Sequence, residues 1–176
     1  MKPRSRSRLR TRGQAIVEFA LVTPILFFLL FAVLEGGLLL FVVGSARFAS
    51  GEAVRQETES GNGATADQDS IAVIRATPMG TTNLGTITEI NIYRLIEQAD
   101  GSLTVDPARI NKYRLDGSAI GAINWPPAVR DVTSAKSDFI GVTIYFTYSW
   151  KSFRLLGQPP MNLNQSFYMR LEPQTY

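Results

Sequence analysis

The chain has 176 residues, 45% apolar and 19% charged, which suits one globular domain with an accessory element and not a disordered chain. It contains neither cysteine nor histidine, which excludes disulfides, cysteine nucleophiles, histidine-based triads and zinc fingers. The net charge of +3 hides an asymmetry: residues 1–13 hold six basic residues and no acid, so twelve basic and 15 acidic residues remain downstream. A basic arm alone would fit nucleic acid, but the segment after it argues against that partner.

From Ala15 to Val43 the chain is apolar, with Glu18 and Glu35 as its only charges. About 20 apolar residues span a bilayer, and this run is longer. Basic residues before such a run hold the N-terminus in the cytoplasm, so we expect a single-pass protein of the cytoplasmic (inner) membrane with its C-terminal body outside. A buried core helix is a poor alternative, because the run is apolar all round. A cleaved secretory signal ending at 44–46 is the stronger rival, although its apolar core should be only about 7–15 residues long.

The residues at the start of this run resemble a known processing site. The stretch 13–19, GQAIVEF, is similar to the cleavage site of type IV prepilins of the Flp/Tad class. Such sites have a basic leader, a glycine before the cut, a glutamate at the fifth mature position and an aromatic residue after it. Together with Pro24 and Glu35-Gly36, residues 12–45 resemble the N-terminus of TadE-like proteins, which are pseudopilins or minor pilins. Residues 168–173 resemble the end of such domains more weakly, and the body is long for a minimal TadE-like domain.

The resemblance implies three parts: a basic leader at 1–13, a transmembrane and extended helix at 14–60, and an exported α+β domain at 61–176. A membrane prepilin peptidase would cut between Gly13 and Gln14 and leave the helix in place. The implied partners are the membrane, that peptidase, the Flp-type major pilin, other minor pilins and the Tad assembly platform. The resemblance implies no cofactor, metal or catalytic residue, and it allows incorporation into a surface pilus that serves cell adhesion.

Two side chains next to the predicted cut are candidates for assembly and recognition, Glu18 and the aromatic Phe19. An ionised carboxylate inside a bilayer costs a few kcal/mol, and less near an interface. The position of Glu18 in the apolar run therefore requires an interaction that offsets this cost. It could extend to the headgroups, since it lies about one turn into the apolar run. Alternatively, it pairs with the new α-amino group of Gln14, on its own chain or on a neighbouring subunit, and so fixes the axial register.

The helix itself should be kinked and too long for the bilayer. Pro24 removes an amide donor and clashes with the preceding turn, which predicts a kink or local melting near residues 20–24. Glu35 is expected at the outer boundary as an interfacial carboxylate. The 29 residues from Ala15 to Val43 reach roughly 43 Å, against a hydrocarbon core of about 30 Å. We therefore expect the excess, Leu38, Leu39, Leu40 and Phe41 above all, to pack against other pilin-class helices, or against the protein's own sheet if the helix end folds back.

The body should be α+β, with a small antiparallel sheet of the type IV pilin kind. Residues 45–60 should continue the helix into solvent as far as Gly61–Gly63, and a short helix near 67–76, capped around Asp67, should bury Ile71 and Ile74. Period-two patterns predict strands at 86–97, with Ile90, Ile92 and Ile96 on one face, at 103–105 after a turn at 99–101, at 139–150, and at 164–172, with Phe167, Met169 and Leu171 on one face. The stretch 106–137 is predicted to be mostly loop.

Catalysis finds no support in the sequence, which has no GxSxG motif, phosphate-binding loop or dinucleotide fingerprint. The sequence therefore favours a structural or assembly protein. The alternative is a membrane-tethered extracytoplasmic binding module unrelated to a filament.

Overall fold

The computed structural model describes residues 7–133, 137–152, 154 and 157–173, with side chains described from Gly13 onward within these ranges. A long helix is followed by two short helices and a four-stranded antiparallel sheet, so the predicted α+β class is confirmed. The elements in chain order are α1 (Ser7–Ser60), α2 (Ala66–Ala76), α3 (Pro78–Thr81), β1 (Gly85–Glu97), β2 (Leu103–Tyr113), η1 (Pro127–Val129), β3 (Phe139–Tyr148) and β4 (Met161–Arg170).

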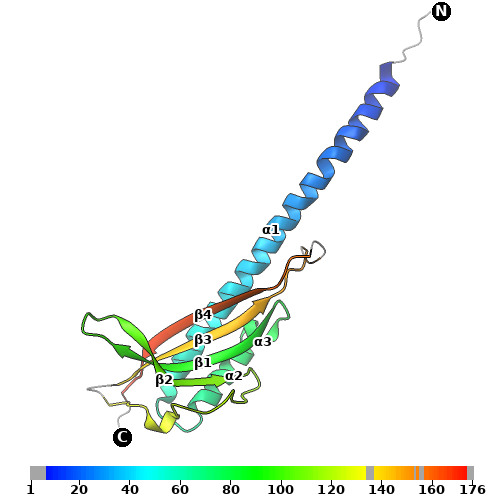
Figure 1. Ribbon diagram of the computed structural model, residues 1–176. Helices are drawn as coiled ribbons and strands as arrows, with labels where there is room; N and C mark the ends of the chain where they lie inside the picture. The colour runs from blue at the N-terminus through cyan, green and yellow to red at the C-terminus, as the bar shows by residue number, and fades with distance from the viewer. Residues whose placement is uncertain (1–6, 134–136, 153, 155–156, 174–176) are drawn as a thin grey trace, which may run out of the picture.

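Helix α1 runs through its 54 residues without interruption and projects its N-terminal half away from the body (Figure 1). It ends where Gly61 adopts a φ of 57° and donates its N–H to the carbonyl oxygen of Glu57 at 2.9 Å, a left-handed stop that favours glycine. The expectation that residues 45–60 enter solvent is wrong. One side of this stretch is fully buried at Ala46, Ala49 and Ala53, because alanine lets the helix approach the body closely.

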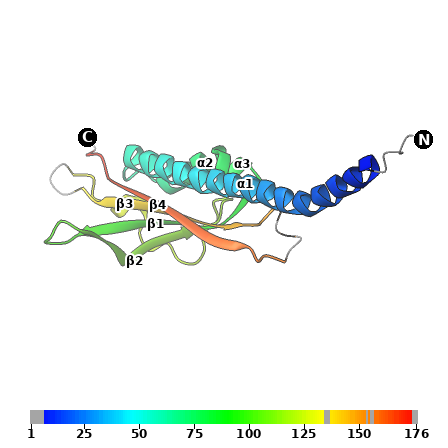
Figure 2. The ribbon, with the colours of Figure 1, turned by 90° about the horizontal axis from the view of Figure 1, so that it is seen from above.

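The sheet has the order β2-β1-β3-β4, and all three pairings are antiparallel. Helices α1, α2 and α3 lie on one side of it (Figure 2). The core fills the space between that side and the helices; its largest fully buried apolar side chains are Trp125, Tyr148, Phe146, Ile71, Ile74, Ile90, Ile92, Ile140, Ile144 and Leu171. The burial of Ile71 and Ile74 in α2 agrees with the prediction.

Strand β3 forms the centre of the core, as the alternation of its residues predicts. Its register places Val142 opposite Phe167 of β4, so the two side chains share the helix-facing side. Phe167 and Met169 nevertheless remain about 40% exposed, because β4 is an edge strand, whereas Leu171 just beyond it is buried. The face predicted for 164–172 is thus correct, and its burial is only partial.

The predicted loop 106–137 is wrong for its first eight residues, which belong to β2. Strand β2 contains Pro107, which an edge strand tolerates because one side of its backbone needs no partner. A register shift opposite Tyr93 and Leu95 interrupts the pairing of β1 with β2, whereas β1 pairs regularly with β3 from Glu89 to Leu95. Ile96, near the end of β1, is 40% exposed, unlike the buried Ile90 and Ile92.

Candidate functional site

The N-terminal half of α1 is an apolar rod without protein around it. It is the one helix in the described part of the chain that is long and apolar enough to cross a membrane. Its large apolar side chains from Ile16 to Leu34 are between 44% and 74% exposed. The stretch from Ala15 to Leu34 has 20 residues and reaches about 30 Å, which equals the hydrocarbon thickness of a bilayer. The exposed rod therefore suits one membrane crossing.

The residues of the predicted processing site lie at the start of this rod. Gly13, Gln14, Glu18 and Phe19 are all exposed, and a Cβ added to Gly13 would meet no atom within 4 Å. Gln14 Nε2 donates to Glu18 Oε1 at 3.0 Å, one helical turn further on. The side chain of Gln14 thus already contacts the Glu18 carboxylate, and cleavage after Gly13 would turn the backbone nitrogen of the same residue into an α-amine. Whether cleavage creates an α-amine here, and whether Glu18 binds it, remain predictions.

Helix α1 passes Pro24 without the predicted local melting, and a kink caused by this proline remains a prediction. The helix is continuous through residues 20–24, and its axis bends within the blue N-terminal portion in Figure 2. Proline lacks the amide proton that would bond to the carbonyl of Ala20. Next to it, Thr23 Oγ1 donates to the carbonyl oxygen of Phe19 at 2.6 Å.

Glu35 ends the exposed rod and joins it to the body. Its side chain is fully buried and accepts hydrogen bonds from Tyr148 Oη at 2.5 Å, from the Lys151 backbone N–H at 2.8 Å and from the Ser152 backbone N–H at 2.6 Å. The carboxylate is thereby satisfied by one hydroxyl and two amides, as a buried charge must be. The expectation of a simple interfacial carboxylate is corrected: Glu35 is buried in the body and fixes the connection between β3 and β4 to the helix.

The four residues predicted for helix packing divide between two environments. Leu38 and Leu39 are partly buried against the body's own core, next to the buried Val42. Leu40 is 73% exposed and Phe41 is 49% exposed. Helix α1 meets the sheet without folding back, since it stays one helix to Ser60. Contact of Leu40 and Phe41 with another subunit remains a prediction.

A second buried polar cluster fixes the C-terminal part of α1. Arg130, which follows η1, donates from Nη1 to Glu57 Oε2 at 2.6 Å and from Nη2 to Asp67 Oδ1 of α2. All three side chains are almost completely buried. One guanidinium thus holds two carboxylates from two helices. No pattern in the sequence predicts this cluster, and Asp67, predicted near the helix cap, is instead an ion-pair partner.

The polar cluster continues toward β2 through hydrogen bonds to Asp67. Tyr113 Oη and Asn111 Nδ2 both donate to Asp67 Oδ2, at 2.6 and 2.9 Å. Burial raises the pKa of the Tyr113 hydroxyl, so it remains a donor. Burial likewise raises the pKa of Glu57 to about 7, which outweighs the attraction of Arg130. Glu57 Oε1 has no hydrogen-bond partner among the described residues, and a proton there makes the cluster neutral.

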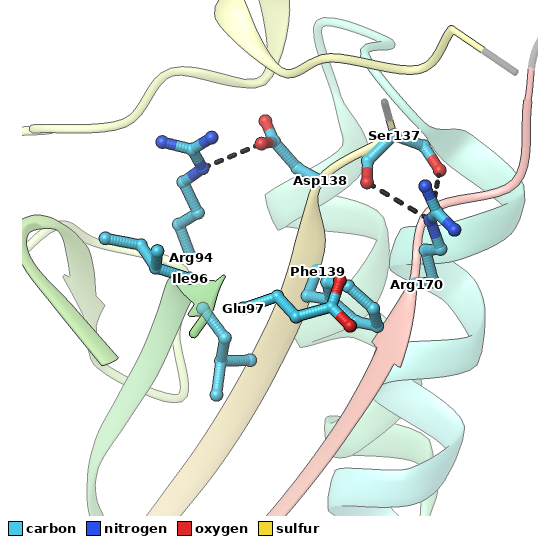
Figure 3. A pocket seen from close by; sticks show the side chains of 8 residues that line it. Arg94, Ile96, Glu97, Ser137, Asp138, Phe139 and Arg170 are labelled. Carbon is cyan, nitrogen blue, oxygen red and sulfur yellow. Dashed lines mark hydrogen bonds and ion pairs between the residues drawn. The ribbon is translucent and has the colours of Figure 1, made fainter. Parts of the chain in front are cut away.

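A groove of about 320 Å³ lies at the end of the sheet where β1 and β4 finish and β3 begins. Figure 3 shows its two arginines turned toward partners of the same chain. Arg94 Nε donates to Asp138 Oδ1 at 2.7 Å, and Arg170 Nε donates to Ser137 Oγ at 2.9 Å. The arginines thus close the end of the sheet. The hydroxyl of Ser137 and the carboxylate of Asp138 in this groove are therefore both engaged by arginines.

Among the residues that the structure describes, no group of three or more Asp or Glu side chains could hold a metal ion. What the described sites can do is mechanical: both buried carboxylates of α1 join the helix rigidly to the body. Glu35 had a signal in the sequence, as a charge in an apolar run. Its partners could not be found, because Tyr148 and the two amides lie more than 110 residues away.

Residues 13–55 match the family model described as TadE-like protein. No curated protein matches the chain, and no solved structure does. The matched segment contains the predicted processing site, the apolar rod and Glu35, and it ends in the half of α1 that packs against the sheet. Residues 13–55 are therefore TadE-like, and the resemblance inferred from the first residues of the apolar run is confirmed over that segment.

Proposed function

We propose that this protein is a structural component of a Tad (Flp) type IV pilus, a minor pilin or pseudopilin that acts in pilus biogenesis and not as an enzyme. The TadE-like match supports the association with a Tad pilus. The observation that carries the proposal is the construction of α1. One half is an exposed apolar rod of membrane length, and the other half is part of the core of the body. Such a protein carries its body at a fixed position on a membrane helix.

The protein spans the cytoplasmic membrane once, with the N-terminus inside and the body outside. The single apolar helix supports the one crossing. The six basic residues among the first thirteen support the orientation, because such residues are retained on the cytoplasmic side. In this orientation a prepilin peptidase meets Gly13 at the cytoplasmic face. Glycine costs a helix about 1 kcal/mol relative to alanine, which favours local opening of the backbone at the cut.

Packing argues that the helix is kept after processing. Secretory cleavage after Ala46 would remove Glu35, Val42 and Ala46, all of which are buried in the body. The connection between β3 and β4 would lose the carboxylate that it binds, and the core would open on one side. Cleavage after Gly13 removes none of these residues. The fold therefore favours a retained helix over a cleaved secretory signal.

The partners that follow from this role are other pilin-class subunits, the Flp-type major pilin and other minor pilins among them, and the Tad assembly platform. In the membrane the apolar rod is available to their helices along its whole length. Glu18 and Phe19 lie on it within the first two turns after the cut. A carboxylate in lipid is most stable beside a positive group, and the α-amine of a mature subunit supplies one.

Mass spectrometry of the membrane-extracted protein, combined with complementation, tests the proposal. We expect a mature N-terminus at Gln14, and loss of pili in a deletion strain that the wild-type gene restores. Gly13→Phe should leave the leader attached and fail to restore pili, with Gly44→Phe as a control that is processed normally. An N-terminus at Arg47 would contradict the prepilin assignment. Normal pili in the deletion strain would favour the membrane-tethered binding module.

A further inference from the structure

The connection between β3 and β4, residues 149–160, is held at a defined height on α1. The backbone amides of Lys151 and Ser152 donate to Glu35, which is the first buried residue after the exposed apolar rod. Figure 1 shows the described residues of this connection, 149–152, 154 and 157–160, at the end of the body that faces the N-terminal half of α1. Because Glu35 ends the stretch of about 30 Å that suits the hydrocarbon core, the connection lies at the level of the lipid headgroups.

The end of the body at this level differs in charge from the rest. The connection 149–160 meets residues 77–86, where Lys151 Nζ donates to the carbonyl oxygen of Asn83 at 3.2 Å. In these two segments Lys151 and Arg154 are the only charged residues, and both are basic. The remainder of residues 14–176 holds ten basic and 15 acidic residues. A cationic end on an acidic body complements an anionic surface.

The same connection forms a recess. Its volume is about 340 Å³, and it is lined by Ser149, Trp150, Arg154, Gln158 and Pro160. Trp150 is held in place, since its Nε1 donates to the carbonyl oxygen of Pro159 at 2.9 Å and its ring meets Tyr148 edge-on at 5.5 Å between centroids. A guanidinium, a hydroxyl and an amide are groups that bind phosphate, and tryptophan is enriched at the headgroup level of membranes.

We propose that this recess binds the headgroups of anionic phospholipids in the leaflet from which α1 emerges, and so docks the body on the membrane surface. The inference rests on the membrane crossing assigned to α1 in the proposed function, but on no role in a pilus. Near an anionic surface each cation is worth about fivefold in affinity. Lys151 and Arg154 together therefore favour a docked body, and docking fixes the direction in which the body leaves the membrane.

The test uses the full chain, reconstituted in vesicles of phosphatidylcholine alone or mixed with phosphatidylglycerol. The chain has no cysteine, so Gln158→Cys accepts an environment-sensitive fluorophore at the recess. Ser118→Cys, exposed in a turn of the body outside both segments, is the control position. We expect blue-shifted emission at position 158 in the anionic vesicles, a smaller shift in phosphatidylcholine, and no difference at position 118.

The charge requirement is tested in the same vesicles. Lys151→Gln with Arg154→Gln should abolish the difference between the two lipids, and Arg109→Gln with Arg114→Gln should preserve it. Alkaline extraction confirms insertion independently, so failure of docking is distinguishable from failure of the membrane crossing. Equal emission in both lipids, or an unchanged response of the Lys151/Arg154 variant, would overturn the proposal. A shift of the emission at position 158 that soluble glycerophosphate removes at equal ionic strength would indicate a free phosphate ligand and would also overturn it. The same holds if the shift occurs only when other membrane proteins are added to the vesicles.

Discussion

Buried carboxylates hold this fold together, and each works because its partners come from distant parts of the chain. Glu35 accepts hydrogen bonds from Tyr148 and from two backbone amides, and Glu57 shares Arg130 with Asp67. A buried charge without such partners would cost several kcal/mol. The two sites therefore fix α1 at both ends of the stretch that packs against the sheet.

Replacing Glu35 should weaken the body strongly. Glu35→Ala leaves the Tyr148 hydroxyl and the two amides without an acceptor, so we expect a loss of about 3 kcal/mol or more. Denaturation of the full chain in detergent micelles measures it. Glu59→Ala is the matched control: its pair with Arg55 is exposed, and we expect about 0.5 kcal/mol or less. Equal losses in the two variants would contradict the anchoring role of Glu35.

The Glu57 cluster makes stability depend on pH. The pKa of Glu57 is raised from 4.5 to about 7 in the folded protein, because burial disfavours its ionised form, so the folded state binds the extra proton. Stability is then fully present below pH 4.5 and is lost as the pH rises through 7, by up to ~1.4 kcal/mol per pH unit. Glu57→Gln keeps an acceptor for Arg130 and removes the titration. Unfolding free energies measured across this window should fall for the wild type and change little for Glu57→Gln; parallel curves would refute the assignment.

Glu18 has a role that can be separated from processing. If it pairs with the α-amine of Gln14, Glu18→Ala should still be cleaved and inserted but should impair piliation, and Glu18→Asp should restore it only in part because its reach is shorter. Immunoblots of processed protein and counts of pili report the two effects separately. Full piliation by Glu18→Ala would leave Glu18 as an interfacial carboxylate.

At the scale of elements, α1 is one uninterrupted helix whose two halves differ in composition and burial. Its first half is apolar on all sides, and its second half buries one side, on which Ala46, Ala49 and Ala53 are fully buried. Gly44 lies on the open side, where an added Cβ meets no atom within 4 Å. The two sides of the second half should therefore respond in opposite ways to larger side chains.

Ala49→Leu should destabilise the body, and Gly44→Ala should stabilise it. The first inserts three carbons where the side chain is fully buried, which costs about 1–3 kcal/mol. The second adds a methyl group in open space and improves helix propensity by about 1 kcal/mol. Thermal unfolding in micelles compares the two. A stable Ala49→Leu variant would mean that α1 is not packed against the sheet as described.

The elements that could be predicted from the sequence are those with local signals. The helix, its stop at Gly61, the buried face of α2 and the alternation of β3 follow from composition and period. Strand β2 extends to Tyr113, beyond the predicted 103–105, and its Pro107 is compatible with a strand because β2 lies at the edge of the sheet. Arg130 stands in an irregular segment, and no local pattern links it to Glu57 or Asp67.

At the scale of the whole molecule, the structure resolves the mismatch between helix length and bilayer thickness. The 29 residues of the apolar run do not share one environment. The large apolar side chains of its first 20 residues are exposed, whereas Glu35 and Val42 are buried and Leu38 and Leu39 pack against the core. In the membrane crossing proposed above, the body begins at the membrane surface without a linker.

The position of that boundary is the central claim, and two cysteine variants test it most directly. Val33→Cys and Leu40→Cys replace side chains that are 74% and 73% exposed, so the protein itself shields neither. In vesicles of the purified chain with the body outward, a water-soluble maleimide should label position 40 and should reach position 33 only after detergent is added. Protection of position 40 by lipid alone, or equal labelling at both positions, would contradict a membrane segment that ends at Glu35.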